Sequence, residues 1–150
     1  MYKTIVRARV RRLWQRINLG DYEAAVKMAA PGLRFRFLAP DTPLDADVTG
    51  PEEFRAWFAR LSDLFPGITF EVRHIAVVGW PWNTALAVRL GVSARLADGT
   101  EYQNDATQSI LLRWGRMIED TVQEDIARLR AAVERQARAR GEGHVPPVAP

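Results

Sequence analysis

The fold is decided by the stretch Thr84–Arg113, TALAVRLGVSARLADGTEYQNDATQSILLR. Apolar residues alternate with polar or small ones before and after Asp98-Gly99, which is the pattern of strands that bury one face. Asp-Gly between two such runs is the strongest short signal for a hairpin. The stretch therefore predicts two long antiparallel strands, over about 84–97 and 100–113.

The flanking sequence extends this hairpin into a meander. Residues 68–79 and 116–123 show strand patterning, and turn residues separate them from the central pair at Trp80–Asn83 and at Gly115. Four consecutive antiparallel strands are therefore expected between residues 68 and 123.

Outside the meander, the sequence predicts one strand, one loop and four helices. Leu33–Leu38 alternates at period two and predicts a strand, whereas Ala39–Val48 holds two prolines and three aspartates and predicts an irregular loop. Apolar residues at helical spacing predict four helices: one that ends at Gly20, a short one between Asp21 and Pro31-Gly32, one from Pro51 to Pro66-Gly67, and one over 124–139.

Helices gathered early and strands gathered late favour an α+β fold, in which a curved antiparallel sheet wraps around three N-terminal helices and a C-terminal helix follows. A chain of 150 residues is long enough for one domain and short for two. We expect a single domain over 1–140. The tail, 141–150, has three prolines and no large core residue, so it is predicted to be disordered.

Composition narrows the function classes. The chain has no cysteine and two histidines, which excludes a disulfide framework, a thiolate zinc site and a cysteine nucleophile. We expect no metal and no nucleotide cofactor. The net charge of +3 comes from basic residues near the two chain ends, as expected for solvated helix faces, so no nucleic-acid partner is expected. No apolar run approaches 18 residues, so we expect no membrane partner and a cytoplasmic location.

Three short motifs carry a family resemblance: Leu19-Gly-Asp-Tyr22, Thr49-Gly-Pro-Glu-Glu-Phe54 and Arg113-Trp-Gly-Arg-Met-Ile-Glu-Asp120. With the order of elements, they resemble the nuclear transport factor 2-like superfamily over about residues 3–125. This superfamily includes SnoaL-like polyketide cyclases and ketosteroid isomerases. The resemblance implies a cone-shaped sheet with a hydrophobic pocket, and a homodimer formed through the convex face of the sheet.

Counting strand register outward from the turns predicts a row of polar side chains. A two-residue turn at Asp98-Gly99 pairs Arg89 with Gln108, and a three-residue loop ending at Gly115 pairs Gln108 with Asp120. Asn104 would lie on the same face. The row lines the cone if it faces inward, or forms a surface ladder if it faces outward. A two-residue turn at Gly115 would instead place Asp105, Thr107 and Ser109 with Asp120.

A carboxyl inside an apolar cone suits a general acid or base, because burial raises its pKa. Asp120 is therefore a candidate catalytic residue, and Arg89 would keep it ionised; the alternative is a structural ion pair. The candidate substrate-binding residues are three polar side chains of the row, four aromatic residues at helical spacing and a histidine in mid-strand: Arg89, Asn104, Gln108, Trp14, Phe54, Trp57, Phe58 and His74.

The resemblance adds a second candidate base. In ketosteroid isomerase-like members a carboxylate lies before the glycine that opens the third helix, which implies Asp41, with Asp45 and Asp47 as rivals. The two oxyanion donors of that mechanism fall on Leu13 and Gln108, which argues against steroid isomerisation. Limonene epoxide hydrolase-like chemistry is also disfavoured, since its two carboxylates fall on glycine and valine: Gly91 and Val122. We expect cyclisation, isomerisation or hydration of a small hydrophobic molecule, or else a non-catalytic binding or dimerisation module.

Overall fold

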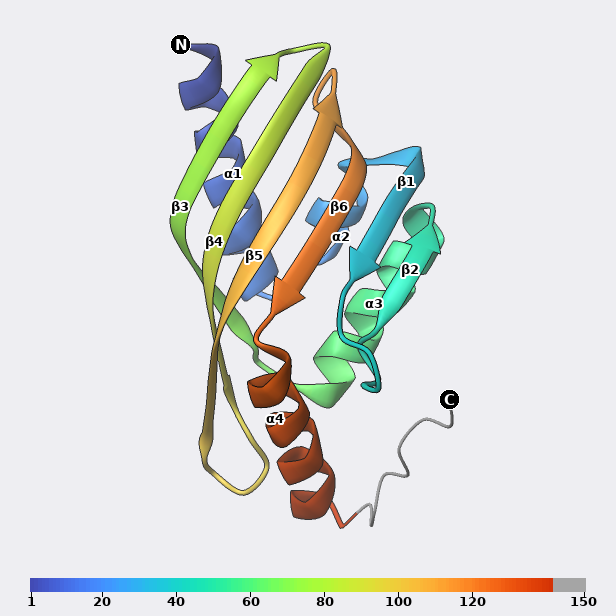
Figure 1. Ribbon diagram of the computed structural model, residues 1–150, viewed down its shortest axis with the longest axis vertical. Helices are drawn as coiled ribbons and strands as arrows, with labels where there is room; N and C mark the ends of the chain where they lie inside the picture. The colour runs from blue at the N-terminus through green and yellow to red at the C-terminus, as the bar shows by residue number, and fades with distance from the viewer. Residues whose placement is uncertain (142–150) are drawn as a thin grey trace.

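The structure is a computed structural model that describes residues 1–141. The predicted disordered tail, 141–150, lies outside the described residues except for Gly141. Figure 1 shows four helices and six strands: α1 (Tyr2–Asn18), α2 (Glu23–Val26), β1 (Ala29–Phe37), β2 (Ala46–Thr49), α3 (Pro51–Leu64), β3 (Thr69–Trp80), β4 (Asn83–Arg95), β5 (Glu101–Arg113), β6 (Arg116–Glu124) and α4 (Ile126–Ala139).

The six strands form one curved, unclosed sheet in the order β2-β1-β6-β5-β4-β3. Strands β3 to β6 are the predicted antiparallel meander, and β1 joins its edge by pairing parallel with β6. Helices α1, α2 and α3 lie behind the sheet in Figure 1, on its concave side. The predicted α+β fold is confirmed.

The hydrophobic core fills the space between these helices and the sheet. Alternate residues of β4 point into it because successive side chains of a strand face opposite sides. Four of them, Leu86, Val88, Leu90 and Val92, are almost fully buried. Helix α1 contributes side chains at spacings of three and four residues, which places them on one face of the helix: Val6, Val10, Trp14 and Ile17.

The N-terminal strands differ from the prediction. Strand β1 begins at Ala29 and includes Pro31-Gly32, which the sequence analysis took as a break. The register of β1 with β6 shifts between Ala29 and Arg34, and such an irregularity accommodates a proline at that point. The predicted loop ends earlier than expected, because β2 forms a short edge strand that pairs with Arg34–Phe37.

The turn between β4 and β5 has three residues and the turn between β5 and β6 has two, which is the reverse of the predicted lengths. Leu96 donates its backbone N–H to Thr100 O, which leaves a three-residue loop at 97–99 with Gly99 at φ 84°. The Asp98 carboxylate stabilises this loop by accepting hydrogen bonds from the Thr100 backbone and hydroxyl. Trp114 and Gly115 both have positive φ, 50° and 78°, and form a two-residue turn of the hairpin type.

The changed turns alter which residues face the core. Gln108 pairs with Val88, and Arg89 pairs with Thr107, so Arg89 lies on the opposite face from Gln108. The register between β5 and β6 shifts by one residue, because Leu111 pairs with Glu119 and Leu112 pairs with Met117. Ile118 of β6 is left without a partner, and it forms a β-bulge. The bulge offsets the shorter turn, and Gln108 and Asp120 still share the concave face.

None of the helices within residues 1–141 combines the length and the apolar character that crossing a bilayer requires.

Candidate functional site

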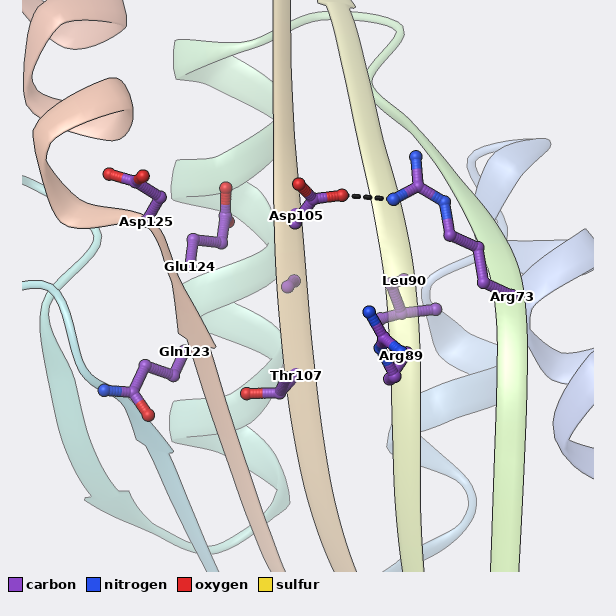
Figure 2. Close-up of a pocket in the computed structure, with 9 residues that line it drawn as sticks. Arg73, Arg89, Leu90, Asp105, Thr107, Gln123, Glu124 and Asp125 are labelled. Atoms are coloured by element: carbon purple, nitrogen blue, oxygen red, sulfur yellow. Dashed lines mark hydrogen bonds and ion pairs between the residues drawn. The ribbon is translucent and has the colours of Figure 1, made fainter.

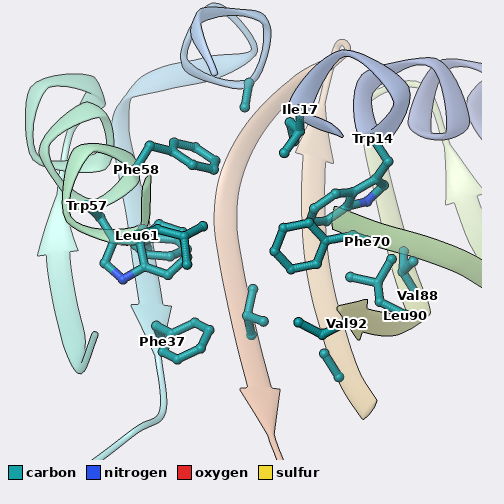
Figure 3. Packing of buried hydrophobic residues seen from close by; sticks show 14 of the residues in the cluster. Trp14, Ile17, Phe37, Trp57, Phe58, Leu61, Phe70, Val88, Leu90 and Val92 are labelled. Atoms are coloured by element: carbon teal, nitrogen blue, oxygen red, sulfur yellow. The ribbon is translucent and has the colours of Figure 1, made fainter. Parts of the chain in front are cut away.

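A small cavity lies inside the cone, between the helices and the concave face of the sheet. Figure 3 shows Trp57, Phe58 and Phe37 on one side of it and Trp14 and Phe70 on the other. The space open to the centre of a water molecule is about 40 Å³, which accommodates about three water molecules. Its wall is apolar except at three side chains that come from β5 and β6: Gln108, Asp120 and Glu124.

Asp120 is the most deeply enclosed of these polar groups. It lies in β6 between its register partners Phe35 of β1 and Ile110 of β5, and its exposed fraction is 3%. Gln108 Nε2 donates a hydrogen bond of 3.0 Å to Asp120 Oδ1. The carboxyl therefore has an apolar residue on each side and an amide as its partner.

This environment changes the acid strength of Asp120. Burial raises the pKa of the Asp120 carboxyl to about 7, because the ionised form loses its hydration, and the hydrogen bond from Gln108 opposes the rise only partly. A carboxyl of this kind holds and releases a proton near neutral pH, which is the requirement for a general acid or base.

Gln108 also has an atom without a partner. Its Oε1 is one of two buried side-chain atoms within residues 1–141 that make no hydrogen bond. A buried acceptor in this state costs about 1–3 kcal/mol until it finds a donor. The hydroxyl of a ligand, a water molecule or a protonated Asp120 facing a rotated amide would each supply one.

A second buried polar cluster lies further along β5 and β6. Tyr102 Oη donates a hydrogen bond of 2.6 Å to Glu124 Oε1. Asn104 Nδ2 donates to Tyr102 Oη at 2.7 Å and to the Asp125 carbonyl at 3.0 Å. Burial raises the pKa of the Glu124 carboxyl, although the hydrogen bonds from Tyr102 and Asn104 act against it. The cavity wall thus holds two carboxyls with raised pKa values.

The structure brings part of the predicted site together. The four aromatic candidates, Trp14, Phe54, Trp57 and Phe58, line the cavity with Gln108 and Asp120. Asn104 is buried, but its side chain is occupied by Tyr102, Glu124 and backbone groups, and it does not line the cavity.

Arg89 and His74 lie on the other side of the sheet, which corrects their predicted placement. They are register partners across β3 and β4, so they share the exposed convex face. Figure 2 shows Arg89 across from Thr107, with Gln123 on the strand beyond it and the ion pair of Arg73 and Asp105 nearby. The predicted row failed at Arg89 because the three-residue loop at 97–99 shifts the β4–β5 register by one residue. Arg89 therefore lies across the sheet from Asp120 and does not hold its carboxylate ionised.

Asp41 also lies outside the cavity. It sits in the loop between β1 and β2 at φ 65°, its side chain is 64% exposed, and Arg130 of α4 approaches it to 3.5 Å. Its rivals Asp45 and Asp47 are exposed as well. Asp45 accepts a hydrogen bond from Ala39 N, and Asp47 forms an ion pair with Arg34. None of the three carboxylates implied by the ketosteroid isomerase resemblance lines the cavity.

Glu124 and Tyr102 are not among the residues predicted from the sequence. The predicted last strand ends at residue 123 and the predicted helix takes in Glu124, whereas α4 begins at Ile126 with Asp125 as its N-cap. The signal was present: Glu124 follows Asp120 by four residues in one strand, and residues at even spacing share a face. The same rule places Tyr102 on the face of Asn104.

Comparison with known proteins agrees with this architecture. The structure of TerC co-crystallised with polyporic acid superimposes with a TM-score of 0.71 at 14% sequence identity, covering 85% of this chain and 96% of TerC. PrhC from Penicillium brasilianum gives a TM-score of 0.70 at 16% identity, covering 89% and 88%. IdmH from Streptomyces antibioticus, assigned as a candidate polyketide cyclase, gives 0.66 at 19% identity, covering 84% and 96%.

At these identities the likeness to solved structures shows the fold alone. The same fold is found in a Burkholderia pseudomallei protein described as NTF2-like, which superimposes with a TM-score of 0.69 at 15% identity, covering 84% of this chain and 95% of that one. A search of curated proteins found no significant match to this chain. The family model described as "SnoaL-like domain" matches residues 10–120, most of the chain, and includes β6 as far as Asp120. On this match, the protein belongs to the SnoaL-like domain family.

Proposed function

We propose that the cone binds a small hydrophobic molecule and that Asp120 acts on it as a general acid and base. The observation that carries this proposal is a carboxyl that is 3% exposed, hydrogen-bonded to Gln108 and open to an apolar cavity. In cyclisation or isomerisation, Asp120 would take a proton from the carbon next to a carbonyl group and return one elsewhere. In hydration, it would take a proton from water.

Gln108 supports this role as a positioning residue. Its Nε2 fixes one oxygen of the Asp120 carboxyl, and its free Oε1 offers an acceptor to a substrate hydroxyl. The aromatic wall supplies apolar contact to a flat molecule. Likeness to TerC, whose structure contains polyporic acid, and to a candidate polyketide cyclase is consistent with an aromatic or polyketide-like substrate.

The size of the cavity weighs against a substrate of ordinary size, so a second candidate is a non-catalytic binding or dimerisation module. Pockets for drug-sized ligands measure about 300–1,000 Å³, and this cavity offers about 40 Å³. A ligand larger than a few atoms must push side chains aside. Binding of this kind requires no proton transfer, and Asp120 would then serve only as a polar contact.

Deuterium exchange separates the two candidates without knowledge of the substrate. The protein is incubated with small enolisable ketones of increasing size in D₂O, and deuterium incorporation is followed by NMR. The wild type should accelerate exchange, and Asp120→Asn should lose about a hundredfold or more of that rate. Glu119→Gln is the matched control, because Glu119 precedes Asp120 in β6 but is exposed.

Exchange that is equally fast in Asp120→Asn would refute the catalytic role of Asp120. Ketones that bind to both proteins with no exchange in either would establish the binding module instead. Binding is read from chemical-shift changes of the ketone in the same samples.

A homodimer through the convex face is also part of the proposal. Ala85 and Ala87 of β4 are exposed on that face, and small side chains let two sheets approach closely. Ala87→Glu should convert a dimer to a monomer in light scattering, and Ala59→Glu on the exposed side of α3 should not. A monomeric wild type would exclude the dimer. A cytoplasmic location stays a prediction.

A further inference from the structure

Exposed hydrophobic side chains gather at one end of the molecule. Eight large hydrophobic residues are exposed within residues 1–141, and two of these, Leu19 and Leu38, lie elsewhere. The other six occupy the start of α1, the β3–β4 hairpin and the β5–β6 turn, which Figure 1 shows together at its upper end. We call this set the aromatic end: Met1, Ile5, Val78, Trp80, Trp82 and Trp114.

The three tryptophans form one continuous group. Trp80 and Trp82 stack with ring centroids 6.0 Å apart, and Trp82 lies 6.2 Å from Trp114. The two hairpins are joined by a 2.7 Å hydrogen bond from Trp114 N to Pro81 O. The exposed fractions of Trp80, Trp82 and Trp114 are 64%, 54% and 73%. Three exposed tryptophans in contact form a patch, whereas single exposed apolar residues are ordinary.

The patch continues onto helix α1 through an apolar groove. The groove has a volume of about 180 Å³ and runs between α1 and the two turns, with Ile5 and Trp114 in its wall. Tyr2 and Thr84 share a hydroxyl hydrogen bond that fixes the start of α1 against β4. The aromatic end is therefore a surface with defined geometry.

The charged residues of the segments that build the aromatic end are all basic. No aspartate or glutamate occurs in residues 1–20, 72–97 or 106–118, and the exposed carboxylate that follows them in β6 is Glu119. Four exposed basic residues belong to it: Lys3, Arg9, Arg113 and Arg116. Arg113 and Arg116 flank the Trp114-Gly115 turn, and the Arg9 guanidinium lies against Gly115.

We propose that the aromatic end docks on the surface of an anionic lipid bilayer. Tryptophan favours the boundary between acyl chains and headgroups, because its ring is apolar and its N–H is polar. The aliphatic members of the patch gain from the same apolar boundary, and nearby lysine and arginine side chains are attracted to anionic headgroups. The sequence predicts no membrane partner because no apolar run is long enough to span a bilayer, but docking on the surface of a bilayer requires no such run.

Two other partners fit the same surface less well. A second copy of the chain would bring Arg113 and Arg116 against like charges. Single-stranded nucleic acid would match the basic residues, but Ile5 and Val78 gain little from nucleotides, and one face of Trp80 is already covered by Trp82. The bilayer proposal does not depend on the proposed catalysis, since none of the six residues of the aromatic end lines the cavity. Val78 is the register partner of Ala85, so the aromatic end borders the proposed dimer face.

Vesicle flotation tests the proposal. The full chain is mixed with vesicles of phosphatidylcholine and phosphatidylglycerol, or of phosphatidylcholine alone, in 0.1 M NaCl. The wild type should float with the anionic vesicles and bind them at least about tenfold more tightly than neutral ones. Trp82→Ser with Trp114→Asn should weaken binding about tenfold or more. Asparagine is chosen because residue 114 has positive φ.

Two further variants make the outcome decisive. Arg113→Glu with Arg116→Glu keeps all three tryptophans and should abolish the preference for anionic vesicles. Leu19→Ala with Leu38→Ala removes exposed hydrophobic side chains away from the patch and should bind as the wild type does. Each variant is compared with the wild type by circular dichroism melting.

Several results would overturn the proposal. The wild type could fail to float, or the leucine control could lose as much binding as the tryptophan variant. The tryptophan variant could instead abolish a concentration-dependent dimer or binding to a single-stranded oligonucleotide while flotation is unchanged. In either of those cases the aromatic end serves the other partner.

Discussion

Asp120→Asn should make the protein more stable than the wild type at pH 8 and not at pH 3. The substitution keeps the shape of the side chain and its hydrogen bond with Gln108 but removes the charge. In the wild type, a folded protein above neutral pH must hold an ionised carboxyl that is 3% exposed and surrounded by Phe35 and Ile110. An unfolded chain hydrates the same carboxylate freely.

The magnitude follows from the pKa. The pKa of Asp120 rises from 3.8 in the unfolded reference to about 7 in the folded protein. The folded state therefore binds the proton more tightly, so its stability is fully present below pH 3.8 and falls as the pH rises towards 7. Each pKa unit corresponds to about 1.4 kcal/mol, which makes the total loss about 4 kcal/mol at pH 8. The asparagine variant has no such loss.

Urea denaturation followed by circular dichroism measures this difference. The free energy of unfolding of the variant minus that of the wild type should grow by about 3 kcal/mol between pH 4.5 and pH 8. Other titrating groups are present in both proteins and largely cancel in the comparison. Glu119→Gln, which neutralises an exposed carboxyl next to Asp120 in the strand, should show no such growth.

A difference that stays constant between the two pH values would refute the reasoning. It would mean that Asp120 ionises in the folded protein about as readily as in water, and therefore that its carboxylate is hydrated despite its burial. The proposed acid–base role would then lose its physical basis, because the carboxyl would hold no proton near neutral pH.

Two further substitutions test the polar contacts around the cavity and α4. Tyr102→Phe removes the 2.6 Å hydrogen bond to Glu124 and should cost about 1–2 kcal/mol; the cost should be larger at pH 8 than at pH 5, because that bond lowers the pKa of Glu124. Denaturation at the two pH values checks this, and an equal cost at both would contradict it. Gln136→Ala deprives the Ala97 N–H and the Leu64 carbonyl of their partners and should cost about 2–4 kcal/mol. Hydrogen exchange should then speed up in α4 first, and uniform acceleration along the chain would count against it.

The elements of the fold were largely predictable from the sequence, because hydrophobic periodicity survives small errors at the ends of elements. The meander is an example: all four of its strands were expected, and β4 alternates as its sequence indicates. Strand β2 was not predictable in this way. Its four residues depend on pairing with Arg34–Phe37 at the edge of the sheet, and a pairing partner leaves no periodic signal in a segment this short.

The candidate site was harder to predict because it depends on register. Whether a side chain faces the cone changes with a shift of one residue, and turn length sets that shift. At Asp98-Gly99 both a two-residue and a three-residue loop suit the sequence, and the choice between them decides that Arg89 lies on the opposite face of the sheet from Gln108. Gln108 and Asp120 were placed on one face only because the β-bulge at Ile118 compensated for the shorter turn at Trp114-Gly115.

The enclosure of Asp120 and the size of the cavity lead to one conclusion about how a ligand would act. With space for about three water molecules, Asp120 retains little hydration, and a hydrophobic ligand that displaces this water would favour the protonated carboxyl still more. The ligand must then offer its own polar group to Asp120 or to Gln108 Oε1, since an entirely apolar molecule would leave both without partners. A ligand that combines a flat apolar body with one carbonyl or hydroxyl group satisfies the aromatic wall and these two polar atoms together.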